Sequence, residues 1–215
     1  MKKLKYIFLL AGALSLASCE SWLDEDPQYT INTKTQFSTV ENARQALMGC
    51  YGYMSADNAY GQAWQEVTFG YCGFGWSQTN GSSTDLLVSM DGGIDETINT
   101  MAWRGMYKVI GETNAFIANI ADSPLESADK LPMEAAARFL RALAYYNLAV
   151  TYGDVPLKTT PSAHDGVAVP RSPKNEVFEL VRTDWEFAYE NLPGKDDDGF
   201  ATKWAAKAYL GKLYH

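Results

Sequence analysis

Histidine and cysteine are scarce in this sequence, and their scarcity removes several classes of function. Two histidines occur among 215 residues: His164, in a proline-rich stretch, and His215 at the chain end. Neither has a context that would hold it rigidly, so a Ser-His-Asp catalytic site is not predicted. The three cysteines and two histidines form no cluster with the spacing of metal ligands. No metal and no cofactor are therefore predicted.

Positive charge is also in short supply. From Cys19 onward the chain has 15 basic and 26 acidic residues, a formal net charge of −11. Nucleic acids and anionic membrane surfaces attract basic proteins, so neither is expected as a partner. Neutral ligands fit this charge better. Aromatic residues make up 13% of the chain, which suits either a ring-rich helical core or a surface that stacks on flat ligands.

Phosphate-binding and calcium-binding motifs are missing as well. Asp91–Gly93 lacks the lysine and the preceding strand of a phosphate-binding loop. Asp196–Gly199 lacks the alternating ligands and the distal glutamate of an EF-hand, and is predicted to be a solvated turn. Cys50 and Cys72 could pair in an oxidising compartment. Cys50 also fits a small buried hydrophobe on a helix face, and free thiols are favoured.

The N-terminus predicts a lipoprotein signal peptide over residues 1–18. Three lysines precede Ile7–Leu16, a ten-residue, mostly apolar run. That run is too short to cross a hydrocarbon core of about 30 Å. Leu16–Cys19 (LASC) matches a lipobox, in which small residues precede the cleaved bond and the Cys19 thiol takes the lipid. An ordinary secretory signal with a chance cysteine is the alternative. Several acyl chains on Cys19 would anchor the protein stably to the membrane.

Apolar spacing predicts that the rest of the chain is mostly helical. Ser38 and Glu41 would form the capping box of the first helix, and Pro132 would lie in the first turn of a central one. Gly153 would end that central helix with a left-handed cap. Ser172 and Pro173 would open another helix after a connecting loop. The expected helices are 38–54, 62–71, 95–121, 133–152, 175–191 and 201–214.

Two helical stripes stand out in these segments. Phe139, Leu143, Tyr146 and Val150 would share one packing face. A longer stripe runs along residues 95–121 in steps of four and three; its members are Trp103, Tyr107, Ile110, Asn114, Ile117 and Ala121. Three tryptophans on such stripes are predicted to be core residues: Trp103, Trp185 and Trp204. Helix 133–152 would return antiparallel to 95–121, and 201–214 antiparallel to 175–191.

Four segments carry a resemblance to a known family. They are Ser21–Asp24 (SWLD) after the lipobox, Ala46–Tyr51 (ALMGCY), Tyr152–Leu157 (YGDVPL) and Ala201–Tyr214 (ATKWAAKAYLGKLY). Together they resemble the SusD/RagB family of nutrient-binding outer-membrane lipoproteins. The Trp-Tyr-Ile-Asn spacing of residues 95–121 also resembles the first helix of a tetratricopeptide hairpin.

The resemblance implies an all-α fold of tetratricopeptide-like helical hairpins with long irregular loops. Family members are more than twice this length, so the C-terminal half of the fold is expected to be missing. The expected layout is a signal peptide (1–18), a lipidated acidic tether (19–36) and a helical region (37–215). In the family, acidic residues just after the lipidated cysteine accompany export to the cell surface. Such residues here include Glu20 and Asp24.

The resemblance also implies a function. A SusD-like protein captures oligosaccharides and passes them to a SusC-like TonB-dependent transporter, with no bond made or broken. The Gly- and Ser-rich loop after residue 71 holds rings and polar side chains suited to sugars, which makes Trp76, Asn80 and Asp85 the candidate ligand contacts. Two alternatives remain open: an anchored glycoside hydrolase that uses an acid pair, and a tetratricopeptide adaptor that binds only protein.

Overall fold

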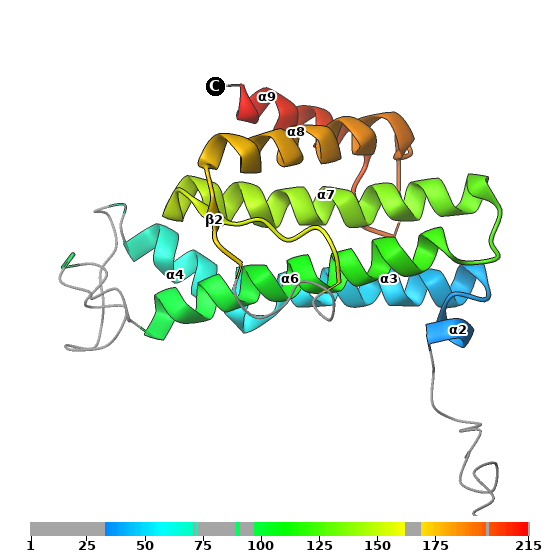
Figure 1. The fold of residues 1–215 in the computed structure, drawn as a ribbon, viewed down its shortest axis with the longest axis horizontal. Coiled ribbons are helices and arrows are strands. Elements are labelled where there is room, and N and C mark those ends of the chain that lie inside the picture. Colours follow the sequence, from blue (N-terminus) through cyan, green and yellow to red (C-terminus); the bar gives the residue numbers. More distant parts are fainter. Residues whose placement is uncertain are drawn as a thin grey trace, which may run out of the picture. The chain divides into compact units, whose positions relative to one another are not determined.

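The computed structural model describes residues 33–70, 72, 89–90, 97–161, 169–196 and 198–214, all within one compact unit, Thr33–His215. The predicted all-α class is confirmed (Figure 1). The described elements, in chain order, are α2 (Thr33–Gln36), α3 (Val40–Ser55), the π-helical turn η2 (Asp57–Gly61), α4 (Ala63–Gly70), α6 (Thr97–Ala121), α7 (Ser127–Tyr152), β1 (Val155–Pro156), β2 (Arg171–Ser172), α8 (Lys174–Asn191) and α9 (Lys203–Leu213).

Helix α7 is the centre of the fold. In Figure 1, α3 and α6 lie on one side of it and α8 with α9 on the other, and successive long helices run antiparallel. The predicted face of α7 is only part of what is buried, because fourteen of its residues between Met133 and Ala149 are buried. Many of them are alanines, which let neighbouring helices approach closely. The predicted burial of Val150 is wrong, since its side chain is 52% exposed near the helix end.

The predicted start of α7 is also wrong. The helix begins at Ser127 and Pro132 lies inside it. Proline removes the N–H that would bond to the carbonyl of Ala128. Ala128 is exposed, so water can bond to that carbonyl and the helix continues. The predicted stop is confirmed: Gly153 has a φ of 73° and its N–H donates to the Ala149 carbonyl.

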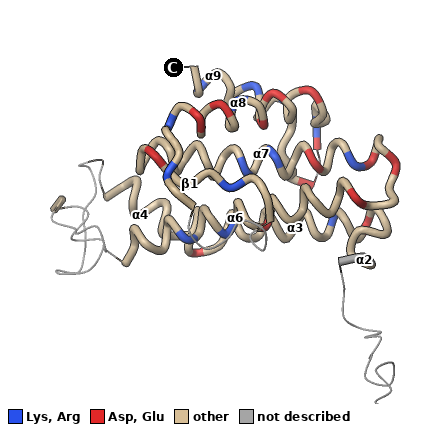
Figure 2. Tube along the Cα trace, in the orientation of Figure 1, with Lys and Arg blue, Asp and Glu red and all other residues tan. Residues whose placement is uncertain are grey.

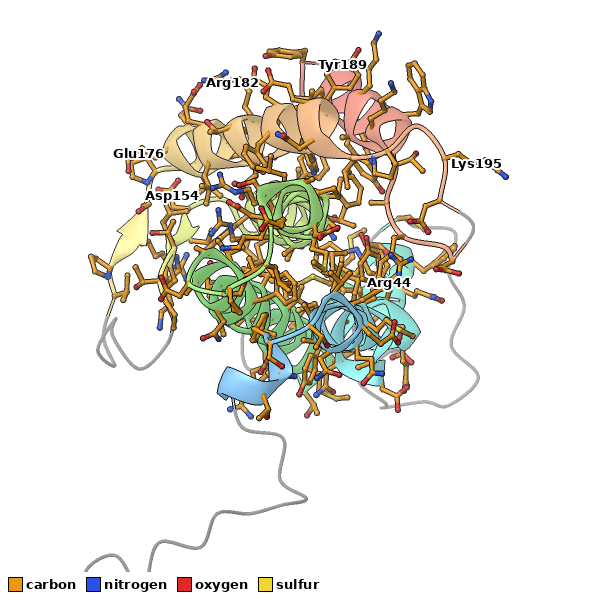
Figure 3. All side chains as sticks on the ribbon, turned by 90° about the vertical axis from the view of Figure 1, so that its right-hand side faces the viewer. Arg44, Asp154, Glu176, Arg182, Tyr189 and Lys195 are labelled. Atoms are coloured by element: carbon orange, nitrogen blue, oxygen red, sulfur yellow. The ribbon has the colours of Figure 1, made fainter. Side chains whose placement is uncertain are left out.

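The segment Gly153–Pro156 joins three helices. The Asp154 carboxylate accepts a hydrogen bond of 2.8 Å from the backbone N–H of Lys174, the first residue of α8 (Figure 3). Val155 is fully buried, and the Pro156 carbonyl accepts a hydrogen bond of 2.8 Å from the Tyr107 hydroxyl on α6. The cap that the Asp154 side chain provides at the start of α8 contributes about 1 kcal/mol to stability. The turn Tyr152–Leu157 is thus a junction between α6, α7 and α8.

Two other predicted helix starts are displaced by one or two residues. Thr39, rather than Ser38, caps α3, because its hydroxyl accepts from the Asn42 N–H at 3.2 Å. Helix α8 starts at Lys174, after Pro173, and its cap comes from Asp154 rather than from Ser172. Ser172 instead belongs to β2, which pairs antiparallel with β1. Pairs of two-residue strands leave no periodic pattern that the sequence could show.

Helix α6 buries a stripe adjacent to the predicted one. Its buried residues include Ala102, Met106, Val109, Thr113, Phe116 and Ile120, together with Ile110 and Asn114. Trp103 and Tyr107 are half-buried, and Ala121 is exposed. The predicted stripe is therefore the flank of α6 that faces the segment after α7. No described helix is both long and apolar enough to span a membrane.

Helix α6 also makes a very close backbone approach to η2. A Cβ atom built at Gly105 would lie 1.8 Å from the Asn58 carbonyl oxygen and 3.0 Å from the Ala59 nitrogen. Both contacts are to backbone atoms, which cannot rotate away as a side chain can. Only glycine fits on α6 at this crossing.

Candidate ligand-binding groove

A buried ion pair fixes the helices behind the candidate site. Arg141 on α7 donates to both carboxylate oxygens of Asp184 on α8, each at 2.8 Å, and the two residues are 5% and 0% exposed. Arg141 also donates to the side-chain oxygen of Asn114 at 2.9 Å. The Asn114 amide in turn donates to the carbonyls of Lys158 and Thr160, at 3.0 and 3.2 Å. This chain of bonds holds residues 158–160 against α6.

Two tyrosine hydroxyls, one on α7 and one on α6, also bond to the backbone of the segment after α7. The Tyr145 hydroxyl accepts from the Lys158 N–H at 2.6 Å and donates to the Lys158 carbonyl at 2.8 Å. The Tyr107 hydroxyl donates to the Pro156 carbonyl. Burial raises the pKa of Tyr107 above its ordinary value, so the phenol remains a neutral donor. The segment is ordered by side chains of two helices.

A groove of about 250 Å³ opens between α6 and this segment. Its rings come from Trp103 and Tyr107, whose centroids are 5.0 Å apart at an interplanar angle of 44°. Tyr152 meets the Trp103 ring edge-on, at 5.1 Å and 80°. The described residues that line the groove are Trp103, Tyr107, Ile110, Gly111, Asn114, Pro156, Lys158, Thr160 and Val169.

The charge of the groove differs from that of the described surface. Acidic residues run along α8 and around the turn between α6 and α7 (Figure 2). The described lining of the groove contains one cation, Lys158, and no carboxylate. Glycoside hydrolysis needs two carboxyl groups about 5 to 9 Å apart, and the described lining supplies neither. Aromatic faces beside amide, hydroxyl and ammonium groups are instead suited to binding a polyhydroxylated ligand.

The predicted ligand contacts Trp76, Asn80 and Asp85 lie outside the described residues, as does the predicted lipidation site Cys19. The structure does describe where their segment is attached. The segment that holds Trp76, Asn80 and Asp85 follows α4 and precedes α6. Helix α4 packs against α6, and the end of α4 and the start of α6 lie at the same end of the helical layer (Figure 1). Trp103 lies fewer than two turns into α6 from that start.

Trp103 was predicted to be a core residue; it is half-buried against the core and it also lines the groove, which was not predicted. The signal that could have found it is the pair Trp103 and Tyr107, one turn apart and followed by Gly111 and Asn114. Because Gly111 has no side chain, it leaves space on the helix face between the two rings and the Asn114 amide. Of the other predicted core tryptophans, Trp185 is confirmed at 0% exposure and Trp204 is wrong at 54%. Trp204 lies on α9, where Ala206 is the single buried residue among those described.

The cysteines, the histidines and the acidic turn at Asp196 were also considered in the sequence analysis, and those that the structure describes form no reactive site. Cys50 and Cys72 are free, as favoured from the sequence; Cys50 is buried and Cys72 is exposed. Burial raises the pKa of the Cys50 thiol to about 12. The two histidines lie outside the described residues, and no group of three or more metal-ligating side chains occurs within them. The predicted turn at Asp196 is confirmed, since its carboxylate accepts from the Asp198 and Phe200 N–H groups.

Comparison with known proteins identifies the family. A family model described as "Starch-binding associating with outer membrane" matches residues 21–215. The chain therefore belongs to the SusD-like family, as its resemblance to SusD/RagB proteins predicted. SusD-like protein P25 of Formosa agariphila is 26% identical, over 97% of this chain and 42% of the relative. The chain thus spans about two-fifths of the length of this curated relative.

Solved structures share the fold. A laminarin binding SusD-like protein matches 82% of this chain and 40% of that structure, with a TM-score of 0.70 and 24% identity. A crystal structure with xylogluco-oligosaccharide matches 79% of this chain and 34% of that structure, with a TM-score of 0.67 and 25% identity. These matches confirm the SusD-like helical fold for the described part of the chain.

Proposed function

We propose that this protein binds oligosaccharides at the cell surface for import and makes or breaks no bond in them. Family membership supports the proposal, and two structures with the same fold are described with laminarin and with xylogluco-oligosaccharide. The observation that carries it is the Trp103–Tyr107 ring pair beside the polar edge at residues 156–160. A sugar ring would lay its C–H face on the indole and direct its hydroxyls at Lys158.

The loop between α4 and α6 would complete this site. Trp76, Asn80 and Asp85 belong to a segment that joins α6 near Trp103. We therefore keep these three residues as proposed ligand contacts. The indole of Trp76 would offer a second stacking surface, and the amide and carboxylate would bind hydroxyl groups.

Replacing Trp103 tests the proposal. Trp103→Ala should weaken oligosaccharide affinity at least about tenfold, because loss of an aromatic anchor costs about 1–2 kcal/mol or more. Trp204→Ala is the control, since it also removes a helical indole, but one on α9 that does not line the groove. Isothermal titration with laminarin-derived and xyloglucan-derived oligosaccharides would measure both variants, and circular dichroism would verify their folding. Equal affinity in the two variants would remove the groove from the binding site.

The family description places related proteins at the outer membrane. We propose further that residues 1–18 are removed as a signal peptide, that Cys19 carries the lipid anchor, and that residues 19–36 form a tether for the helical region 37–215. A Cys19→Ala variant should then leave the membrane pellet and appear in the soluble fraction after cell lysis. Retention of that variant in the pellet would show that another feature attaches the protein.

The proposed partner is a SusC-like TonB-dependent transporter, to which the bound oligosaccharide would be delivered. Membership of the SusD-like family supports this partner. Import of the cognate glycan should fall in cells that lack this protein, and unchanged import in such cells would count against the proposal.

A further inference from the structure

A second hollow lies on another face of the helical layer. It has a volume of about 550 Å³, compared with about 250 Å³ for the Trp103 groove. Ligand-binding pockets commonly have volumes of about 300–1,000 Å³. It lies between α3 and the segment that leads into α9, and its described lining residues are Glu41, Arg44, Gln45, Met48, Tyr51, Asp198, Gly199 and Phe200. In Figure 3, Arg44 lies on the opposite side from Asp154 and the two strands.

One wall of the hollow is a guanidinium group in a fixed position. Arg44 forms ion pairs with Asp198 and, at 3.8 Å, with Asp196. The same guanidinium lies over the Phe200 ring, 4.5 Å from its centroid. Both carboxylate contacts use Nη2, and the guanidinium also carries N–H donors on Nη1 and Nε that a ligand could use. Because the group is already held from two sides, a ligand would spend little entropy in ordering it.

The floor of the hollow is apolar. Tyr51 meets Phe200 edge-on, with centroids 4.9 Å apart and an interplanar angle of 83°. The Tyr51 hydroxyl accepts a hydrogen bond of 2.8 Å from the Ala201 N–H, which fixes the segment to α3. Burial raises the pKa of Tyr51 to about 12, so the ring remains neutral. Met48 is 57% exposed beside these rings.

The α3 side of the hollow, which carries Arg44, also supplies acceptors and a donor. Glu41 and Gln45 are one turn apart on α3, and their side chains are joined by a hydrogen bond of 3.4 Å. That distance is long, so both groups retain the capacity to bond to a ligand. Both side chains belong to exposed residues.

The charges of the lining disfavour an anionic ligand. Its two carboxylates, Glu41 and Asp198, outnumber its one cation, Arg44, which is already paired with Asp198. A neutral molecule with hydroxyl groups on its edge and C–H groups on its face matches the whole lining. Its hydroxyls would bond to the carboxylate, amide and guanidinium groups, and its C–H face would cover Met48 and Phe200. We propose that this hollow is a second saccharide-binding site, separate from the Trp103 groove. This inference rests on the proposed function for the chemical class of its ligand.

Methionine methyl NMR tests the second site directly. Met48 is 57% exposed in the hollow, whereas Met54 on the same helix is 8% exposed and outside it. In the full-length protein labelled at methionine methyls, laminarin-derived or xyloglucan-derived oligosaccharides should shift the Met48 resonance, assigned with Met48→Leu, and leave that of Met54 unchanged. Glu41→Gln should weaken the Met48 response at least about fivefold. Glu66→Gln is the control, because Glu66 on α4 also accepts a hydrogen bond from a glutamine four residues before it, Gln62.

The outcomes separate this inference from the proposed function. A Met48 shift that survives in Trp103→Ala and weakens in Glu41→Gln would support a separate second site. Binding that is lost in Trp103→Ala, with an unmoved Met48 methyl in the wild type, would overturn the second site and leave the proposed function standing. An absence of any glycan binding to the wild-type protein would overturn both.

Discussion

Replacing Arg141 with methionine should destabilise the protein by about 3–5 kcal/mol, because the change leaves the buried carboxylate of Asp184 without its partner. Asp184 is fully buried, and Arg141 supplies two hydrogen bonds of 2.8 Å to it. The more distant Arg138, with 3.7 Å between Nη1 and the carboxylate, cannot replace both bonds. Urea unfolding followed by circular dichroism would measure the loss.

Two further variants show whether the loss comes from the buried charge. In the double variant Arg141→Met with Asp184→Leu, both charges are absent, and much of the lost stability should return. Arg182→Met is the surface control: Arg182 pairs with Glu179 and Glu186 on the exposed side of α8, and its removal should change stability little. A single-variant loss of less than about 1 kcal/mol would show that water reaches Asp184.

Gly105→Ala should destabilise the protein by about 1–3 kcal/mol or more, because the new methyl group would overlap the backbone of η2. The added Cβ would lie 1.8 Å from the Asn58 carbonyl oxygen. Either α6 or η2 must move, and both pack against the core. Thermal unfolding of the purified variant would show a lower midpoint temperature.

Glycines on α3 provide the matched control with the opposite sign. A Cβ at Gly49 or Gly52 would meet nothing within 4 Å. Alanine in a helix interior is favoured over glycine by about 0.5–1 kcal/mol, so Gly49→Ala should stabilise the protein. A stable Gly105→Ala variant would mean that η2 does not approach α6 as closely as the structure shows.

The fold was largely predictable because the long helices have strong periodicity. Helix α6 was predicted over 95–121 and observed over Thr97–Ala121. The periodicity could not show which side of a helix would face which neighbour. Trp103 therefore looked like a core residue, although the non-helical segment after α7 leaves a groove beside it. Trp204 also looked like a core residue, but α9 has one buried residue among those described, Ala206, and leaves Trp204 exposed.

Contacts between distant residues were not predictable from local pattern. The cap of α8 comes from Asp154, twenty residues away from Lys174 along the chain. The pairing of β1 with β2 depends on two residues in each strand. For the site, composition pointed to the loop residues Trp76, Asn80 and Asp85, which stay predictions. The groove itself arises where Asn114, Tyr145 and Tyr107 fix the segment after α7, and no single stretch of sequence contains that arrangement.

The hydrogen bonds behind the groove have a consequence for the thermodynamics of binding. Residues 156–160 form its polar edge, and their backbone groups are bonded to Asn114, Tyr145 and Tyr107. Immobilising a side chain on binding typically costs about 0.5–1.5 kcal/mol. Here the edge is ordered during folding, so the proposed oligosaccharide would meet a surface that is already rigid. If the groove binds as proposed, sequence changes in the core at Arg141 or Asp184 would weaken that binding through an entropic cost, although neither residue lines the groove.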